Sequence, residues 1–214
     1  MQITCLHTAQ VHVQSFEKLF RNSGYNGKLD HVVRADLLDR ARADGVAAVA
    51  TDLRAAVGQT GPSDAVLCTC STLGPLVDDL ARTVPHLLRI DRPLMEQAVQ
   101  VGGKVLVVIC LASTQAATLD LFGAIATQTG CDPTHDLLLC DQAWPLFEAG
   151  DVDGFGRAIA HAVKAALMAD PDVAVVVLGQ ASMTAAEPHL ADIGMPVLSS
   201  PQLAVDRAME IARS

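Results

Sequence analysis

The segment from Asp64 to Gly74, DAVLCTCSTLG, has a counterpart in the segment from Asp172 to Met183, DVAVVVLGQASM. Each begins with an aspartate, continues as a short apolar run and ends in small polar residues. An apolar run of this length, bounded by turn residues, predicts a buried strand of a parallel sheet. Binding groups gather in the loops that follow such strands, because loop amides and the positive end of the next helix attract anions.

The two segments differ in the group that follows the strand. The first places the thiol of Cys70 there, and the second places the carboxamide of Gln180. This weak repeat predicts two similar half-domains. Because a thiol and a carboxamide have different reactivity, the two halves are expected to do different chemistry.

Short apolar runs alternate with helical patterns along the rest of the chain, which indicates repeated βα units. We expect an α/β protein made of two similar half-domains with parallel, flavodoxin-like sheets. The first comprises residues 1–94 and 197–214, and the second comprises residues 95–196. Strands are expected at Gln2–Leu6, Leu29–Val33, Ala65–Thr69, Leu87–Ile90, Val105–Cys110, His135–Leu139, Val173–Leu178 and Pro196–Leu198. Helices are expected at Ser15–Arg21, Asp36–Val57, Pro75–Thr83, Pro93–Val101, Thr114–Thr129, Gly154–Ala169 and Pro201–Ala212.

The composition excludes several classes of partner. The 214 residues are 50% apolar and 3% aromatic, so the core must be packed mainly with Ala, Val and Leu. A formal net charge of −9 repels nucleic-acid phosphates and anionic lipids. We therefore expect a small-molecule partner, and neither nucleic acid nor membrane. The oligomeric state is left open, and a homo-oligomer is compatible with the sequence.

The chain carries no signal for a membrane or for export. Its longest apolar run, Val105–Ala112, is far shorter than the roughly 20 residues that span a bilayer. The amino-terminal residues lack a basic segment followed by an apolar stretch, so a cytoplasmic location is expected. Six cysteines without short regular spacing fit reduced and mostly buried thiols better than a disulfide framework.

Four predicted strands end in loops rich in hydroxyl groups and free amides. If the strand ends of both halves converge, these loops line a cleft between the half-domains. Such a lining suits a small carboxylate, which accepts several hydrogen bonds without an arginine. The loops are Leu6–Thr8, Cys70–Thr72, Leu111–Thr114 and Gln180–Ser182, and the expected substrate-binding residues are Thr8, Ser71, Thr72, Ser113, Thr114, Gln180, Ala181 and Ser182.

Cys70 is the first candidate catalytic residue. It lies before a helix predicted to begin near Pro75, where loop amides are expected to lower the pKa of the thiol. The alternative is a buried cysteine that acts as a small hydrophobe, which is the role we expect for Cys68. The two thiols could alternatively form a redox pair or hold a metal, but they are a poor chelate without further ligands, so we expect no metal site.

His7 is the second candidate catalytic residue, because it ends the first predicted strand and imidazole titrates near neutral pH. The alternative is a histidine that is hydrogen-bonded at the strand end. Two further polar residues are expected at helix starts. Ser15 is expected to cap its helix, and Asp36 either caps its helix or contacts a polar group of the substrate.

Several motifs occur in a fixed order over nearly the whole chain. They are CST at residues 70–72, IDRPLMEQAVQVGGKVLVVICLAST at 90–114, VVVLG at 175–179 and PVLSSPQLAVDRA at 196–208. Together they resemble the aspartate/glutamate/hydantoin racemase superfamily, which includes amino-acid racemases, hydantoin racemase, maleate isomerase and arylmalonate decarboxylase. The resemblance implies two similar α/β domains with the active site between them, a final helix that packs on the first domain, and catalysis without a cofactor.

The resemblance also implies a role for Cys70. In the racemases of this superfamily, two thiols flank the substrate α-carbon, and one removes the proton that the other returns. The first thiol corresponds to Cys70, whereas the position of the second, after Leu178 and Gly179, holds Gln180. A carboxamide does not titrate at accessible pH and cannot serve as a general acid or base.

Three functions fit these residues. The favoured one is a cofactor-independent, racemase-like enzyme in which Cys70 alone transfers a proton beside a carboxylate, as a racemase, an isomerase or a decarboxylase. The second is a racemase whose other base is His7. The third is a protein that binds small carboxylates without turning them over.

Overall fold

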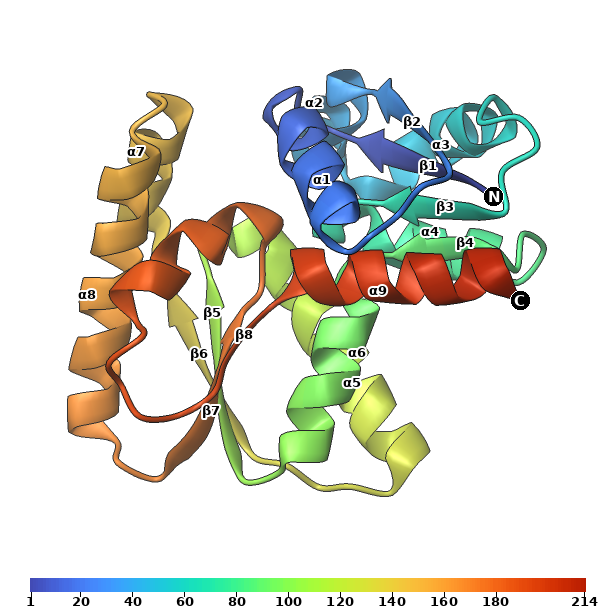
Figure 1. The fold of residues 1–214 in the computed structure, drawn as a ribbon. Coiled ribbons are helices and arrows are strands. Elements are labelled where there is room, and N and C mark those ends of the chain that lie inside the picture. Colours follow the sequence, from blue (N-terminus) through green and yellow to red (C-terminus); the bar gives the residue numbers. More distant parts are fainter. The chain divides into compact units, whose positions relative to one another are not determined.

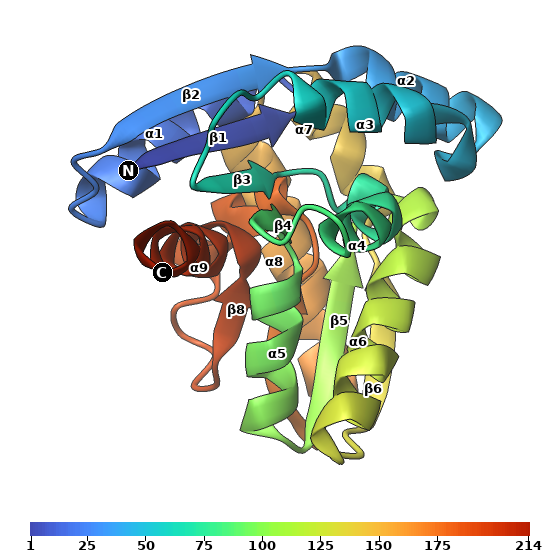
Figure 2. The same ribbon diagram turned by 90° about the vertical axis from the view of Figure 1, so that its right-hand side faces the viewer.

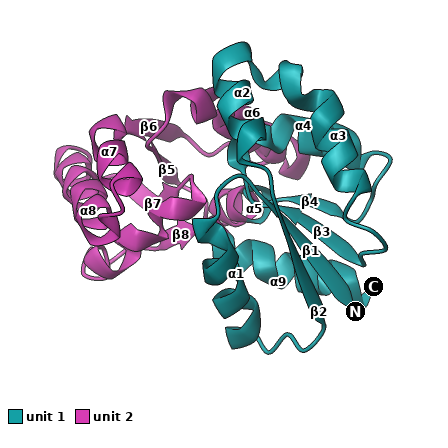
Figure 3. Cartoon of the chain, turned by 90° about the horizontal axis from the view of Figure 1, so that it is seen from above, with its two compact units in different colours: residues 1–93, 201–214 teal, residues 94–200 magenta.

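The computed structural model describes all 214 residues, and the chain divides into two compact units (Figure 3). The first unit comprises Met1–Pro93 and Pro201–Ser214, and the second comprises Leu94–Ser200. Each unit contains one parallel sheet of four strands. The predicted α/β class with two similar parallel-sheet halves is therefore confirmed.

The first sheet has the strand order β2-β1-β3-β4 (Figures 1 and 2). Its strands are β1 (Gln2–His7), β2 (Lys28–Val33), β3 (Ala65–Cys68) and β4 (Leu87–Arg89). Two helices cover one face, α1 (Val11–Asn22) and α9 (Ser200–Arg213), and three cover the other, α2 (Ala35–Asp44), α3 (Ala50–Gly58) and α4 (Gly74–Ala81) (Figure 3). Because parallel strands need a crossover between them, the loops after all four strands lie at the same edge of the sheet.

Alternation along the strands divides the side chains between the two faces. Leu6 and Cys68 are paired in the sheet and belong to the apolar core under α2, α3 and α4. Their neighbours Cys5 and Leu67, also paired, therefore point to the opposite face. On that face the ring of Phe16 from α1 packs 5.5 Å from the ring of His7.

The second sheet repeats the same order as β6-β5-β7-β8. Its strands are β5 (Lys104–Ile109), β6 (His135–Leu139), β7 (Val173–Leu178) and β8 (Val197–Ser199), and its helices are α5 (Arg92–Val101), α6 (Gln115–Thr129), α7 (Trp144–Glu148) and α8 (Val152–Ala169). Thus β5 takes the place of β1, and β7 takes the place of β3. Phe155 and Ile159 of α8 are fully buried in the apolar core that packs on this sheet.

Several sequence-based expectations about secondary structure are confirmed. All eight expected strands are present, with ends displaced by at most one residue. Pro93 and Pro201 are each the second residue of a helix, where proline is tolerated. Five of the six cysteines are buried, and only Cys131 is exposed. None of the helices combines the length and apolar character needed to cross a membrane.

Other expectations were wrong. The single helix expected over residues 36–57 is interrupted at Gly45, whose φ of 90° ends α2 before a 3-10 turn and α3 begin. Ser15 lies inside α1, which begins at Val11, and caps nothing. Asp36 lies in the first turn of α2 without capping it, and accepts two hydrogen bonds from Arg34 instead. The sequence analysis also missed α7 and the 3-10 turns of Ala181–His189.

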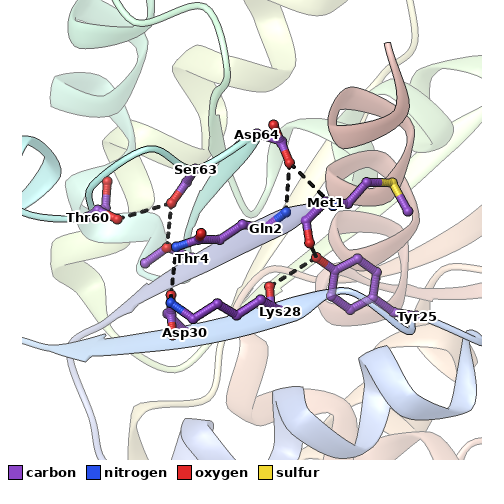
Figure 4. A network of polar contacts seen from close by, with 9 residues as sticks. All are labelled: Met1, Gln2, Thr4, Tyr25, Lys28, Asp30, Thr60, Ser63 and Asp64. Atoms are coloured by element: carbon purple, nitrogen blue, oxygen red, sulfur yellow. Dashed lines mark hydrogen bonds and ion pairs between the residues drawn. The ribbon is translucent and has the colours of Figure 1, made fainter.

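A polar network fixes the amino-terminal edge of the first sheet (Figure 4). The backbone N–H of Gln2 donates to Asp64 (2.7 Å), and the side chains of Gln2 and Lys28 both donate to Asp30 (2.8 Å each). The Tyr25 hydroxyl donates to the Lys28 carbonyl (3.0 Å). The aspartate that opens the DAVLC segment thus tethers the start of β3 to the start of β1.

We expect Gly156→Ala to destabilise the second unit. A Cβ at this position of α8 would lie 2.2 Å from the carbonyl oxygen of Ala185, so the packing of α8 on the 3-10 turns must open. Overpacking of this kind costs about 1–3 kcal/mol. The matched control is Gly123→Ala in α6, where nothing lies within 4 Å of the new Cβ and a gain of about 0.4–1 kcal/mol is expected. Urea unfolding measures both, and equal effects would contradict the packing argument.

Candidate functional site

Cys70 begins the loop between β3 and α4, two residues after the end of the strand. The residue is 7% exposed. A short 3-10 turn follows Cys70 and leads directly into α4. Cys68 and Cys70 both belong to the core cluster under α2, α3 and α4, as expected for residues two apart on an extended strand.

Two opposing effects act on the pKa of Cys70. Burial is the larger and raises the pKa above its ordinary value of 9.0. The Thr8 hydroxyl, the backbone N–H groups of Thr72 and Leu73 and the Thr72 hydroxyl act to lower it. The net shift is upward, so the expectation of a lowered pKa and a partial thiolate was wrong. Cys70 is a protonated thiol at neutral pH, surrounded by hydrogen-bond donors.

A buried ion-pair network supports the loop that carries Cys70, and the sequence analysis missed it. Arg89, at the end of β4, donates two hydrogen bonds to Asp91 (2.7 and 2.9 Å) and one to Asp78 (2.5 Å). Burial acts to lower the pKa of the guanidinium, but the carboxylates of Asp91 and Asp78 together outweigh it and raise the pKa above its ordinary value. The guanidinium lies directly against Gly74, where a Cβ would be 2.2 Å from Nη2. The only feature of the sequence that pointed to this network was the presence of Arg89 and Asp91 at the end of a predicted strand.

Gln180 occupies the corresponding position in the second unit, two residues after the end of β7. Its Oε1 accepts hydrogen bonds from the backbone N–H groups of Cys110 (2.5 Å) and Leu111 (3.1 Å). These two amides follow β5, the strand beside β7. The carboxamide therefore joins the ends of two neighbouring strands, and it occupies the Leu111 amide, which belongs to a loop whose amides were expected to be free.

The remaining candidate binding residues differ in accessibility. In the first unit Thr8, Ser71 and Thr72 are buried. In the second unit Thr114 is buried and donates its hydroxyl proton to the Leu111 carbonyl, which leaves its oxygen lone pairs as acceptors. Ser113 is exposed, and Ala181 and Ser182 are partly exposed.

His7 has both ring nitrogens in hydrogen bonds. Nδ1 lies 2.8 Å from Thr69 Oγ1, and Nε2 lies 2.9 Å from His31 Nδ1. Burial, together with the neighbouring His31 and His12, lowers the pKa of His7 to about 3. The ring points to the face of the sheet covered by α1, whereas Cys70 belongs to the core cluster on the other face.

No protein-family model matches the sequence, and no curated protein sequence matches it. Solved structures do match the fold. A glutamate racemase isoform from Bacillus anthracis has a TM-score of 0.75 over 99% of this chain and 81% of its own, at 14% identity. The aspartate racemase of Picrophilus torridus has a TM-score of 0.67 over 99% and 94% of the two chains, at 12% identity. An arylmalonate decarboxylase has a TM-score of 0.57 over 100% and 94%, at 13% identity.

The chain has the fold of the aspartate and glutamate racemases. The resemblance expected from the sequence motifs is thus confirmed as a shared fold, which covers nearly the whole chain. Within this racemase fold, the repeated strand order makes Cys70 and Gln180 equivalent in position. A thiol and a carboxamide occupy the two positions, and only the thiol titrates.

We expect Gln180→Leu to destabilise the protein by about 2 kcal/mol, because the buried N–H groups of Cys110 and Leu111 lose their acceptor. Gln115→Leu, at an exposed position at the start of α6, makes the same chemical change and should stay within about 0.5 kcal/mol of the native chain. Urea unfolding compares the two variants. Equal stabilities would show that the carboxamide does not hold the two strand ends.

Proposed function

We propose that this chain is a cofactor-independent enzyme that transfers a proton at a carbon adjacent to a carboxylate, with Cys70 as its single acid–base group. One observation carries the proposal. Of the two equivalent loop positions in the racemase fold, one holds a thiol among hydrogen-bond donors and the other holds a carboxamide engaged with backbone amides. The fold shared with racemases and with an arylmalonate decarboxylase supports this class of chemistry.

The protonation state of Cys70 favours proton donation over proton removal. Because its pKa is raised, the resting group is S–H, which is a general acid. A substrate of the malonate type fits this state. When its C–C bond to one carboxyl group breaks and carbon dioxide leaves, the electron pair remains on the α-carbon. The thiol proton then forms the new C–H bond, and water returns a proton to the thiolate.

The proposed substrate is a small carboxylic acid. The backbone N–H of Thr72 and the hydroxyls of Thr8 and Thr72 around Cys70 supply donors for an enolate or a carboxylate oxygen. We propose the same binding role for the loops of the second unit, where the Ser113 and Ser182 hydroxyls and the Gln180 amide N–H groups are donors that suit a carboxylate. Thr114 takes part only if its hydroxyl releases the Leu111 carbonyl. The residues proposed to bind substrate are Thr8, Ser71, Thr72, Ser113, Thr114, Gln180, Ala181 and Ser182.

The hypothesis of a racemase with His7 as its second base receives less support. A second base needs a free nitrogen, and both nitrogens of His7 are occupied by Thr69 and His31. Its lowered pKa also makes the neutral imidazole a weak base. The one-thiol mechanism explains Cys70 without requiring these hydrogen bonds to break.

The decisive experiment follows small carboxylates, malonates, amino acids and hydantoins by proton NMR in D2O, with chiral analysis of the products. We expect deuterium to enter beside a carboxylate with one configuration, and Cys70→Ser to lose at least about a hundredfold in rate, in keeping with the loss of a general acid. Cys68→Ser is the matched control, because this buried thiol lies two residues away. Incorporation with both configurations would reveal a second base. An unchanged rate in Cys70→Ser would exclude the mechanism, and ligand binding without exchange would indicate a binding protein.

The pH dependence of turnover tests the state of the thiol. A group with a raised pKa stays protonated until the pH passes that value, so a reaction that needs Cys70 as an acid should hold its rate through neutral pH. The rate should fall only above 9.0, the ordinary pKa of the thiol. A mechanism that needs a thiolate would show the opposite dependence, with a rate that rises toward high pH. Steady-state rates from pH 6 to 10.5, measured with the best substrate of the panel, distinguish the two.

A further inference from the structure

Three potential metal ligands meet on the face of the first sheet that α1 covers. Cys5 and His7 are two residues apart on β1, so their side chains point to the same face. His31 on β2 is paired directly with Cys5 in the parallel ladder. The ligand atoms of all three residues lie within 4.8 Å of one another. This cluster was not predicted from the sequence, because 24 residues separate His7 from His31 on the next strand.

The two imidazoles are oriented by groups behind them. Thr69 Oγ1 lies 2.8 Å from Nδ1 of His7, which leaves Nε2 facing His31. On the other ring, Nδ1 faces His7, whereas Nε2 is buried without a hydrogen-bond partner and lies 4.0 Å from a carboxylate oxygen of Glu17. A hydroxyl or carboxylate behind each ligating imidazole is the usual outer shell of a metal site, since it fixes the tautomer and the ring orientation.

We propose that Cys5, His7 and His31 form a binding site for a divalent transition-metal ion of the zinc type. One thiolate with two imidazoles suits zinc and disfavours magnesium and calcium, which prefer oxygen ligands. Zinc bonds of about 2.0–2.1 Å to nitrogen and about 2.3 Å to sulfur place tetrahedral ligand atoms roughly 3.3–3.6 Å apart. The two facing nitrogens, at 2.9 Å, must therefore separate by roughly 0.4 Å, and the sulfur must approach them by a small side-chain movement.

The surroundings indicate a structural site rather than a catalytic one. Cys5 and His7 are fully buried, and Phe16 packs against the His7 ring, so a bound ion would have little access to solvent. His12, at the start of α1, lies with its ring centre 6.3 Å from that of His7 and is the candidate for a fourth ligand. The ion would then join β1, β2 and α1.

The space beside Glu17 is open. A surface pocket of about 200 Å³ opens there between α1 and β2, lined by Glu17, Phe20, Arg21, Tyr25, Gly27 and Leu29. Leu29 lies two residues before His31 on β2 and shares its face of the sheet. The proposed metal site is separate from Cys70 and does not depend on the proposed function.

A titration with Co²⁺ tests the proposal, because this ion binds at zinc sites and its absorption spectrum depends on its ligands. Chelator-treated chain, with its thiols kept reduced by a phosphine, is titrated with Co²⁺. We expect a sulfur-to-cobalt charge-transfer band in the near ultraviolet and the visible bands of a tetrahedral ion, which saturate at a single ion per chain and disappear on addition of Zn²⁺. Cys5→Ser should lose the charge-transfer band. Thr69→Val, which removes the hydroxyl behind His7, should weaken binding about tenfold.

The matched controls substitute the same types of residue at positions outside the cluster. Cys68→Ser removes another buried thiol, Cys131→Ser removes the exposed thiol, and His161→Ala removes an exposed imidazole. All three variants should retain the charge-transfer band. Because replacement of the buried Cys5 costs stability, His31→Asn provides a second test. Zn²⁺ should raise the melting temperature of the native chain and not that of this variant. The proposal is overturned if the native chain shows no charge-transfer band, if Cys5→Ser retains it, or if Zn²⁺ stabilises native chain and His31→Asn equally.

Discussion

Parallel pairing of the strands is the constraint on which the rest of each unit depends. A parallel strand cannot be joined to its neighbour by a hairpin, so every connection must cross the sheet, mostly through a helix. All loops that follow the strands are thereby brought to one edge. In the first sheet this places Thr8, which follows β1, beside Cys70, which follows β3. In the second sheet it places Gln180 beside the amides that follow β5.

The repeated topology gives the two units the same scaffold and leaves their chemistry to a few side chains. At equivalent positions the first unit has a thiol and the second has a carboxamide. The thiol is kept protonated by burial, whereas the carboxamide replaces a titratable group with a hydrogen-bond bridge between two strands. This difference between the two units is the basis of the proposed one-thiol mechanism. It is not what a symmetric exchange between two thiols requires.

Buried polar groups have different roles on the two faces of the first sheet. On one side of the Cys70 loop, the Arg89–Asp91 pair fills the space beside Gly74, and its two hydrogen bonds offset part of the cost of burying both charges. On the face covered by α1, two histidines and a cysteine lie together with few partners other than each other. The first group is complete within the protein, whereas the second gathers a thiol and two imidazoles whose ligand atoms lie within 4.8 Å of one another, which is why it carries a ligand hypothesis.

Local patterns in the sequence were sufficient to determine the strands, most of the helices and the α/β class. Short apolar runs bounded by turn residues have few other solutions, and the DAVLC and DVAVVV segments are such runs. The motifs around Cys70 and Leu198 were also sufficient to indicate the racemase fold. The sequence predicted helix boundaries less well. The break at Gly45 depends on a positive φ, which a glycine can adopt but does not always adopt.

Only the tertiary structure decided the state and partners of the functional groups. The pKa of Cys70 depends on how deeply the loop is buried, and this desolvation outweighs the donors that the local sequence suggests. The engagement of Gln180 with the β5 amides, the pairing of Arg89 with Asp91 and the meeting of Cys5 with His31 all join residues on different elements. Local sequence specifies which strand each residue belongs to. Distances between side chains on neighbouring strands exist only after the sheet has formed.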